Sequence, residues 1–339
     1  MKQNAIPCLE NKFVTNSNRR KRIKIGIPRA LLFFRYGNFW QRFFQELGME
    51  VILSPKTDKM ILEKGLGRVS SEVCLPIKVI CGHIEELIDK ADYIFLPRLV
   101  TLKDNLYACP KMIGIVDVAL LEFANSCPIL APKIRNNFFL PHFYIGLKLT
   151  HNPLRSFQAL KRARSALKEV KTIPEFPLDK PKIALISHFY NLEDDFIAKD
   201  IIQTFKRNGF LIYTKEDLPD SILSSAQGFA RNIRWVYERE LYNAFNYYLD
   251  KVDGIVTVIS FGCGPDSLIA EMMAEKAKTY HKPFLSLIID EHTGQAGLVT
   301  RLEAFIDCLK RQRATRSVHR TQSKACVERN EANAGRSKQ

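Results

Sequence analysis

The strongest constraint on the fold is an alternation of apolar segments with amphipathic segments, which runs twice along the chain. The first series begins with "RIKIGIP" (22–28) and continues with the helix-like "FWQRFFQELG" and the strand-like "MEVILSP". The second series begins with "KPKIALISHF" (180–189). Apolar strands that alternate with amphipathic helices indicate parallel sheets covered by helices on both faces. We therefore predict an α/β fold of two Rossmann-like, doubly wound domains with mainly parallel sheets and a cleft between them.

The two series divide the chain into five segments. In order, we predict a basic disordered N-terminal tail (1–22), a first α/β domain (23–150), a helical linker (151–180), a second α/β domain (181–309) and a basic disordered C-terminal tail (310–339). Within the second domain, "AQGFARNIRWVYERELYNAFNYYL" predicts one long helix. In this architecture ligands bind at the carboxyl ends of the strands, so we expect the functional site there.

The net charge of +15 belongs mainly to the two ends of the chain. Residues 1–24 and 310–339 supply +6 and +7 of it, so the middle of the chain carries only about +2. The tails lack interleaved aromatic residues and any helix-turn-helix or zinc-finger pattern. We therefore interpret them as solvated ends and expect no nucleic-acid partner.

The apolar segments also bear on location and redox state. No apolar signal segment follows Lys2, and no apolar run approaches the roughly 18 residues that span a bilayer. We expect a cytoplasmic protein with no membrane partner. In a reducing compartment the eight cysteines are not expected to form a disulfide framework, so cysteines in loops suggest metal or redox chemistry.

Three cysteines share one sequence setting. Cys74, Cys109 and Cys263 each lie one or two residues before a proline, at the expected start of a helix. A thiol there faces free backbone N–H groups and the positive end of the helix dipole, which lowers its pKa and favours the thiolate. The spacings match no local metal motif, so a shared metal site depends on the strand ends of both domains meeting at one cleft.

Four further residues have open interpretations. Cys127 precedes a proline at a strand start, and Cys81 lies two turns after the start of its helix, so we interpret both as packing residues. His83 could orient toward the site or be a satisfied buried histidine. Arg29 follows the first strand, where it could meet an anionic ligand or form an ordinary ion pair.

The segment "IIDEHTG" places a carboxylate–histidine group at the end of the last strand. Glu291 and His292, beside Asp290, are therefore candidates for acid–base catalysis. The alternative is that Thr293 caps the final helix while the acidic residues lie in solvent near its positive end.

An ordered series of motifs carries a family resemblance over roughly residues 23–308. The segments are "IGIPRALLFFRYGNFWQRFFQELGMEVILSPKT", "SSEVCLPIKVICGHIEEL", "DYIFLPRL", "YACPKMIG" and "DEHTGQAGLVTRLEAFID". The chain resembles the activase-related proteins of the 2-hydroxyacyl-CoA dehydratase and benzoyl-CoA reductase superfamily. The resemblance implies a [4Fe–4S] cluster that is held in the cleft by Cys74, Cys109 and Cys263. Three thiolates would leave one iron open to a substrate oxygen or another small ligand.

The resemblance also implies a function and partners. It implies an iron–sulfur redox protein that passes a low-potential electron to a ligand at the open iron, supplied by an ATP-dependent activase or reductase in trans. An acyl-CoA or another small molecule would be the substrate, and a dimer is compatible with the resemblance. No phosphate-binding motif G-x-x-x-x-G-K-[ST] occurs in this sequence. The alternatives are a double-cubane-type reductase and a non-catalytic scaffold that holds zinc with the three cysteines and His83.

Overall fold

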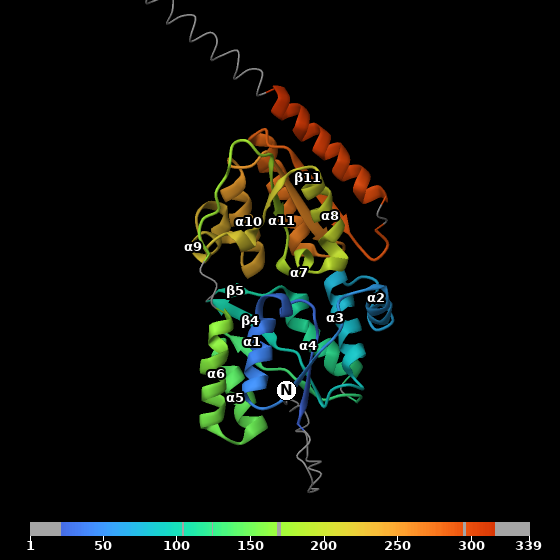
Figure 1. Ribbon diagram of the computed structural model, residues 1–339, viewed down its shortest axis with the longest axis vertical. Helices are drawn as coiled ribbons and strands as arrows, with labels where there is room; N and C mark the ends of the chain where they lie inside the picture. The colour runs from blue at the N-terminus through green and yellow to red at the C-terminus, as the bar shows by residue number, and fades with distance from the viewer. Residues whose placement is uncertain (1–21, 104, 124, 168–170, 294–295, 316–339) are drawn as a thin grey trace, which may run out of the picture.

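The computed structural model describes residues 22–315 except 104, 124, 168–170 and 294–295. Two halves, each built on a four-stranded parallel sheet with flanking helices, lie one above the other, with the first half lower in the view of Figure 1. The α/β fold class and the parallel sheets that we predicted from the alternating pattern are confirmed.

The first sheet has the strand order β2-β1-β3-β6. Its strands are β1 (Lys24–Ile27), β2 (Glu50–Leu53), β3 (Tyr93–Phe95) and β6 (Ile129–Leu130). All pairings are parallel, and Ile25 in the central strand pairs with Val51 on one side and Tyr93 on the other. The apolar residues of β1 are fully buried because helices cover both faces of the sheet.

The second sheet repeats this order as β11-β10-β8-β9, again with parallel pairings throughout. Its strands are β8 (Lys182–Ile186), β9 (Leu211–Tyr213), β10 (Gly254–Ser260) and β11 (Phe284–Ile289). In both sheets the first strand along the chain lies between the second and the third. The strand order therefore reverses between the first and third strands, and the carboxyl ends of these two strands border the switch point where such sheets bind ligands.

Helices connect the strands in both halves. Those of the first half are α1 (Phe33–Glu46), α2 (Lys59–Leu66), α3 (Leu75–Leu87), α4 (Pro110–Phe123), α5 (Phe139–Thr150) and α6 (Pro153–Ala163), followed by the 3₁₀ turn η1 (Arg164–Leu167). Those of the second half are α7 (Phe189–Leu192), α8 (Asp195–Arg207), η2 (Lys215–Asp217), α9 (Asp220–Leu223), η3 (Gly228–Asn232), α10 (Val236–Tyr248), α11 (Gly264–Thr279) and a final helix over residues 296–315.

Two apolar segments are each divided by a proline into two strands. "YIFLPRLV" forms β3 and then β4 (Arg98–Lys103), and "CPILAPKI" forms β6 and then β7 (Lys133–Arg135). The breaks fall at Pro97 and Pro132, which have no N–H to donate to a ladder. After the breaks, β4 and β7 pair with each other and with β5 (Leu106–Tyr107) in a separate three-stranded sheet, order β5-β4-β7.

The prediction of one long helix over residues 226–249 is wrong. The structure has η3, an extended segment at residues 233–235, and then α10. The extended segment forms because it pairs with the first half: Tyr107 N–H donates to Arg234 O at 2.9 Å, and Tyr107 bridges Trp235. The Arg239 guanidinium donates back to Ile233 O, which holds the segment against the start of α10.

The segment boundaries also shift at two places. Helix α6, within the range interpreted as a linker, packs on the first half, where Ser156 Oγ donates to Phe143 O at 2.8 Å. Residues 310–315 continue the final helix, and Arg313 pairs with Asp253 at 2.8 Å, so they are not part of a disordered tail. The rest of the two predicted tails, residues 1–21 and 316–339, lies outside the described residues.

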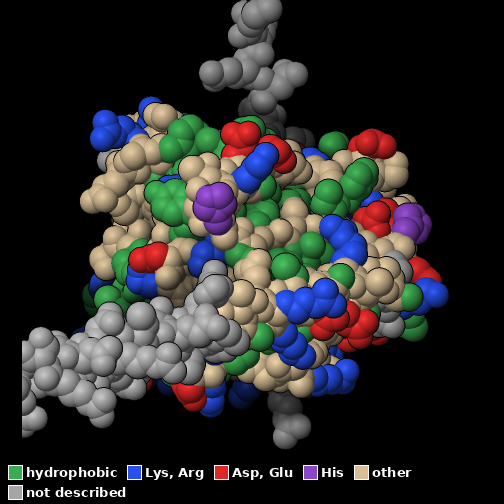
Figure 2. All heavy atoms as spheres, turned by 90° about the horizontal axis from the view of Figure 1, so that it is seen from above, with side chains coloured by type: hydrophobic (Ala, Val, Ile, Leu, Met, Phe, Trp, Pro, Cys, Tyr) green, Lys and Arg blue, Asp and Glu red, His purple; other side chains and the backbone are tan. Residues whose placement is uncertain are grey.

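One hydrophobic core extends through both halves. Its buried members include Ile25 and Phe95 of the first sheet, and Leu185, Val256 and Leu287 of the second. Figure 2, which views the molecule from above, shows acidic and basic side chains interspersed over the face of the second half. Among the described residues, no helix combines the length and apolar character that crossing a membrane requires.

Candidate metal centre

The structure places each of the three proline-associated cysteines at the start of a helix, as their setting predicts. Cys74 precedes α3, Cys109 precedes α4 and Cys263 precedes α11. The carbonyl oxygen of each accepts the first hydrogen bonds of its helix. Proline fits the first helical turn because its missing N–H would have no partner there.

A backbone N–H from the first helical turn faces each sulfur. Met112 N–H donates to Cys109 Sγ at 3.4 Å. The N–H groups of Ile77 and Asp266, each likewise three residues after its cysteine, act on Cys74 and Cys263 in the sense that lowers the thiol pKa. The three sites thus share one local geometry, which favours sulfur in its anionic form.

Direct contacts bring the three helix starts together. Gly262, with φ of +76°, lies so close to the segment before α3 that an added Cβ would be 3.2 Å from Glu72 O and 3.6 Å from Cys74 N. Lys111 of α4 donates to Gly262 O at 2.7 Å and to Glu72 O at 3.4 Å. The charges of Cys74 and Cys109 also contribute to raising the pKa of Cys263. The chain therefore gathers segments from both halves around these thiols.

The expectation that the helix starts would lower the thiol pKa is wrong. Burial raises the pKa of Cys109 to about 12, and it raises the pKa values of Cys74 and Cys263 as well. The Asp266 carboxylate adds to the upward shift at Cys263, whereas Lys111 opposes it at Cys74. The N–H groups act in the expected direction, but desolvation outweighs them.

A buried polar cluster that the sequence interpretation missed lies beside Cys263. A ring nitrogen of His188, the Cys263 sulfur and an Asp266 oxygen lie within 4.8 Å of one another. His188 Nε2 and Asp266 Oδ1 are 2.7 Å apart, and Glu238 Oε1 of α10 lies 4.0 Å from Nε2. Asp266 and Glu238 raise the pKa of His188 despite its burial, and burial raises the pKa of Glu238 to about 7.

A signal for His188 was present in the chain. It follows β8, the first strand of the second half, just as Arg29 follows β1 in the first half. Asp266 belongs to the same short segment as Cys263. Because β8 and β10 border the switch point of the second sheet, residues directly after both strands meet there.

His83 does not join the cysteines. It lies nine residues after Cys74 on the same helix, which corresponds to about 13 Å along the axis. Its Nε2 is 3.0 Å from Thr57 Oγ1, and burial together with Arg29 lowers its pKa to about 4. Arg29 is half-buried with its guanidinium over the Phe33 ring, and no carboxylate pairs with it among the described residues.

The acid–base candidates at the end of β11 have separate environments. Glu291 is nearly buried and forms an ion pair with Lys78, which lies one turn after Cys74 in α3 and is 1% exposed. This pair joins the second half to the helix of Cys74. His292 is exposed, and its N–H donates to Asp290 Oδ1 at 2.9 Å. Thr293 Oγ1 also donates to Asp290 Oδ1, so Asp290 closes the turn after the strand.

Cys81 and Cys127 pack in the core. Cys81 is fully buried, and burial raises its pKa to about 12. Cys127 is 2% exposed, and its sulfur lies 3.6 Å from Ala91 O. Both positions agree with their interpretation as packing residues.

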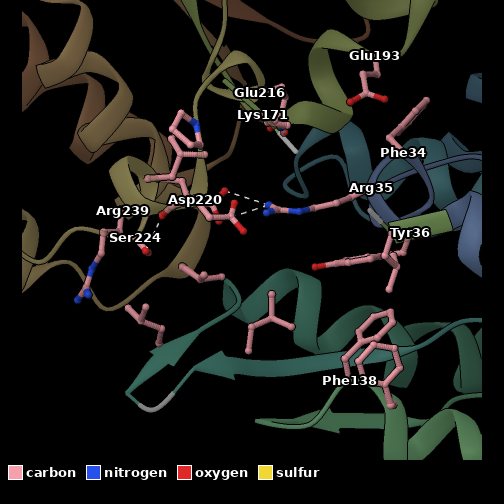
Figure 3. A pocket seen from close by; sticks show the side chains of 18 residues that line it. Phe34, Arg35, Tyr36, Phe138, Lys171, Glu193, Glu216, Asp220, Ser224 and Arg239 are labelled. Carbon is pink, nitrogen blue, oxygen red and sulfur yellow. Dashed lines mark hydrogen bonds and ion pairs between the residues drawn. The ribbon is translucent and has the colours of Figure 1, made fainter. Parts of the chain in front are cut away.

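A cavity of about 720 Å³ lies between the halves. Figure 3 shows Arg35 extending across it from α1, with Tyr36 and Phe138 on one side and Glu216 and Lys171 on another. Helix α10 connects the cavity to the thiols, because Arg239 and Glu240 line the cavity while Glu238 acts on the Cys109 thiol.

A family model described as the CoA enzyme activase uncharacterised domain matches residues 24–218, which is more than half of the chain. The chain belongs to this CoA enzyme activase family. The matched range holds Cys74, Cys109 and His188, whereas Cys263 and Asp266 lie beyond it. No curated protein matches the chain. The relation to CoA-enzyme activases that the motifs implied is therefore confirmed at the level of the family.

Proposed function

We propose that this CoA enzyme activase family protein binds a [4Fe–4S] cluster through Cys74, Cys109 and Cys263 and passes a low-potential electron through it to a ligand of the fourth iron. The observation that supports this is the gathering of three cysteines, each at a helix start with an N–H of the first turn facing its sulfur. Cluster irons are held by cysteine thiolates, and hydrogen bonds to the sulfurs tune the reduction potential.

The protonation state of the three thiols is suited to binding a cation. Cys74 and Cys263 are buried and Cys109 is half-buried, and their raised pKa values keep the three thiols neutral. A bound cation deprotonates coordinating thiols. Binding would therefore release protons and should weaken as the pH falls. The same burial restricts solvent access to the centre, which is one of the properties that set a cluster potential.

Electron supply and substrate belong to the same proposal. The family relation supports a partnership with a CoA-enzyme system, in which an ATP-dependent activase or reductase in trans would deliver the electron. The cavity between the halves, with apolar and charged walls, would take an acyl-CoA or another small molecule. A tetrahedral zinc site completed by His83 is disfavoured, because His83 lies far along α3 from Cys74.

Metal analysis of the anaerobically reconstituted protein tests the proposal. The wild-type protein should be brown and should bind about four irons and four sulfides, as the composition of one such cube requires. Cys263→Ala should lose most of the iron because only two thiolates remain. Cys81→Ala is the matched control, since this buried cysteine is on the helix of Cys74 but faces the core.

Two outcomes would contradict the proposal. A colourless protein that takes up zinc but no iron would point to a structural metal site. Equal iron loss in Cys81→Ala and Cys263→Ala would indicate a four-cysteine site with no open iron, so the protein would be an electron carrier that binds no ligand at its cluster.

A further inference from the structure

In the cluster of His188, Cys263 and Asp266, the three-cysteine proposal uses only Cys263 and leaves the histidine and the aspartate without a role. These residues are 2%, 8% and 5% exposed, and one donor atom from each lies within 4.8 Å of the other two. His188 and Cys263 follow the ends of β8 and β10, the two strands that border the switch point of the second sheet, and Asp266 lies in the first turn of α11.

The imidazole of His188 has one nitrogen engaged and the other without a partner. Nε2 hydrogen-bonds to Asp266 Oδ1 at 2.7 Å, while Nδ1 is buried and has no hydrogen-bond partner among the described residues. An unpaired polar atom in the interior is costly, so a buried one calls for an explanation.

The ring is also held in a fixed orientation. It stacks on Tyr190, with 4.7 Å between centroids and 18° between planes, and Tyr237 lies edge-on to it at 6.3 Å. Histidines that bind metals characteristically give their second ring nitrogen to a carboxylate, which fixes the tautomer and the orientation of the ring. His188 with Asp266 reproduces that arrangement next to a cysteine of the proposed cluster.

We propose that His188 is the nitrogen ligand of the fourth iron in the resting protein, with Asp266 as the residue that positions it. This inference rests on the proposed function. The bond that forms is a dative bond from a ring-nitrogen lone pair to iron. No electron is transferred, and any proton on that nitrogen leaves to solvent. An exogenous ligand of the iron would have to displace His188, so access to the iron becomes a ligand exchange.

Nitrogen coupling at the reduced cluster tests the inference. The full-length protein is reconstituted anaerobically and reduced with dithionite, and pulsed EPR is recorded with natural-abundance histidine and with histidine ¹⁵N-labelled in the ring. The wild-type protein should show a nitrogen coupling that changes with the isotope. His188→Gln should lose the coupling while keeping its cluster. His83→Gln is the matched control, since His83 is equally buried but distant from the cysteines, and this variant should keep the coupling.

The outcomes separate this inference from the proposed function. A wild-type protein with normal iron and sulfide but no isotope-sensitive coupling overturns the inference alone, as does a coupling that persists in His188→Gln. A wild-type protein that binds no iron overturns the proposed function and the inference with it. If His188→Gln does not fold, the wild-type isotope comparison still decides whether any histidine binds, and His188→Asn serves as the second variant.

Discussion

At the scale of single residues, burial decides the protonation state more than local backbone geometry does. The three cysteines have the helix-start setting that lowers a thiol pKa, and yet burial raises all three pKa values. His83 and His142 show the same effect on a base, because burial lowers the pKa of each to about 4. These groups remain neutral near pH 7, so the charge of the interior comes from paired carboxylates and cations.

His142 should make stability depend on pH. Its Nε2 accepts a hydrogen bond from Trp40 Nε1–H at 3.1 Å, and its Nδ1 lies 2.6 Å from Phe138 O, so the neutral ring is satisfied. Below pH 6.5 His142 binds a proton in the unfolded chain, whereas in the folded chain it is protonated only near pH 4. The stability from His142 is therefore present above pH 6.5 and falls by about 2–3 kcal/mol toward pH 4.

Urea unfolding between pH 4 and 7 measures this dependence. His142→Gln, which keeps an acceptor for Trp40, should show a flatter pH profile than the wild-type protein. A variant with an unchanged profile would show that His142 does not contribute. His83 should contribute a similar but separate slope over the same range.

At the scale of secondary-structure elements, close backbone contact sets the position of the helix that carries Cys74. Gly65 of α2 and Gly82 of α3 face each other. A Cβ on Gly82 would lie 1.9 Å from Ile61 O, and one on Gly65 would lie 1.8 Å from Lys78 O. Because these neighbours are backbone atoms, a side chain could be accommodated only by moving a helix. The α2–α3 contact therefore requires glycine at both positions because a side chain would not fit between the helices. Neither glycine has a positive φ.

Gly82→Ala should destabilise the protein by about 3 kcal/mol, at the upper end for overpacking, because the two helices must separate. Gly114→Ala is the matched control: Gly114 lies inside α4 with no atom near the position of an added Cβ. This change should stabilise the protein by about 0.5–1 kcal/mol through helix propensity. Thermal and urea unfolding measure the stability of both variants. Equal changes in the free energy of unfolding would contradict the argument that Gly82 is required for close helix packing.

At the scale of the whole molecule, the two halves are joined by a shared core and by a buried ionic network. Arg35 of the first half pairs with Glu240 of α10 at 3.0 Å, and Lys215 pairs with the same carboxylate at 2.9 Å. Although burial opposes ionisation, these two cations lower the pKa of Glu240. Another ion pair between the halves, Lys56 with Asp195, is largely exposed. The buried network therefore contributes more to holding the halves together than this exposed pair does.

Glu240→Gln should destabilise the protein by about 3 kcal/mol, because it leaves half-buried Arg35 and buried Lys215 without their shared charge. Asp195→Asn breaks the exposed pair and should cost less than about 1 kcal/mol. Urea unfolding measures the free energy of unfolding of both variants. Equal losses of stability would contradict the larger contribution of the buried network. The lowered pKa of Glu240 also makes stability depend on pH. The stabilisation from its carboxylate is present above the pKa of the unfolded state, and it is lost as the pH falls through the lower pKa of the folded state.

Much of the fold follows from the sequence, because apolar periodicity and proline position are local signals. The apolar segments around Ile25 and Ile183 predict strands, and these segments form the first strand of each parallel sheet. The prolines after Cys74, Cys109 and Cys263 predict the starts of three helices, and the structure has them. Each of these signals is contained within a few residues, so it can be interpreted without knowing what the chain packs against.

The tertiary structure alone decided the features that depend on distant segments. The extended segment before α10 forms because it pairs with Tyr107. The helical pattern of residues 226–249 does not show this pairing, because Tyr107 lies in a distant part of the sequence. The separation of His83 from the cysteines and the approach of His188 and Asp266 to Cys263 depend on how helices pack and how strands are ordered. The raised thiol pKa values likewise reflect desolvation by both halves together, whereas the sequence shows only the helix start on which each thiol lies.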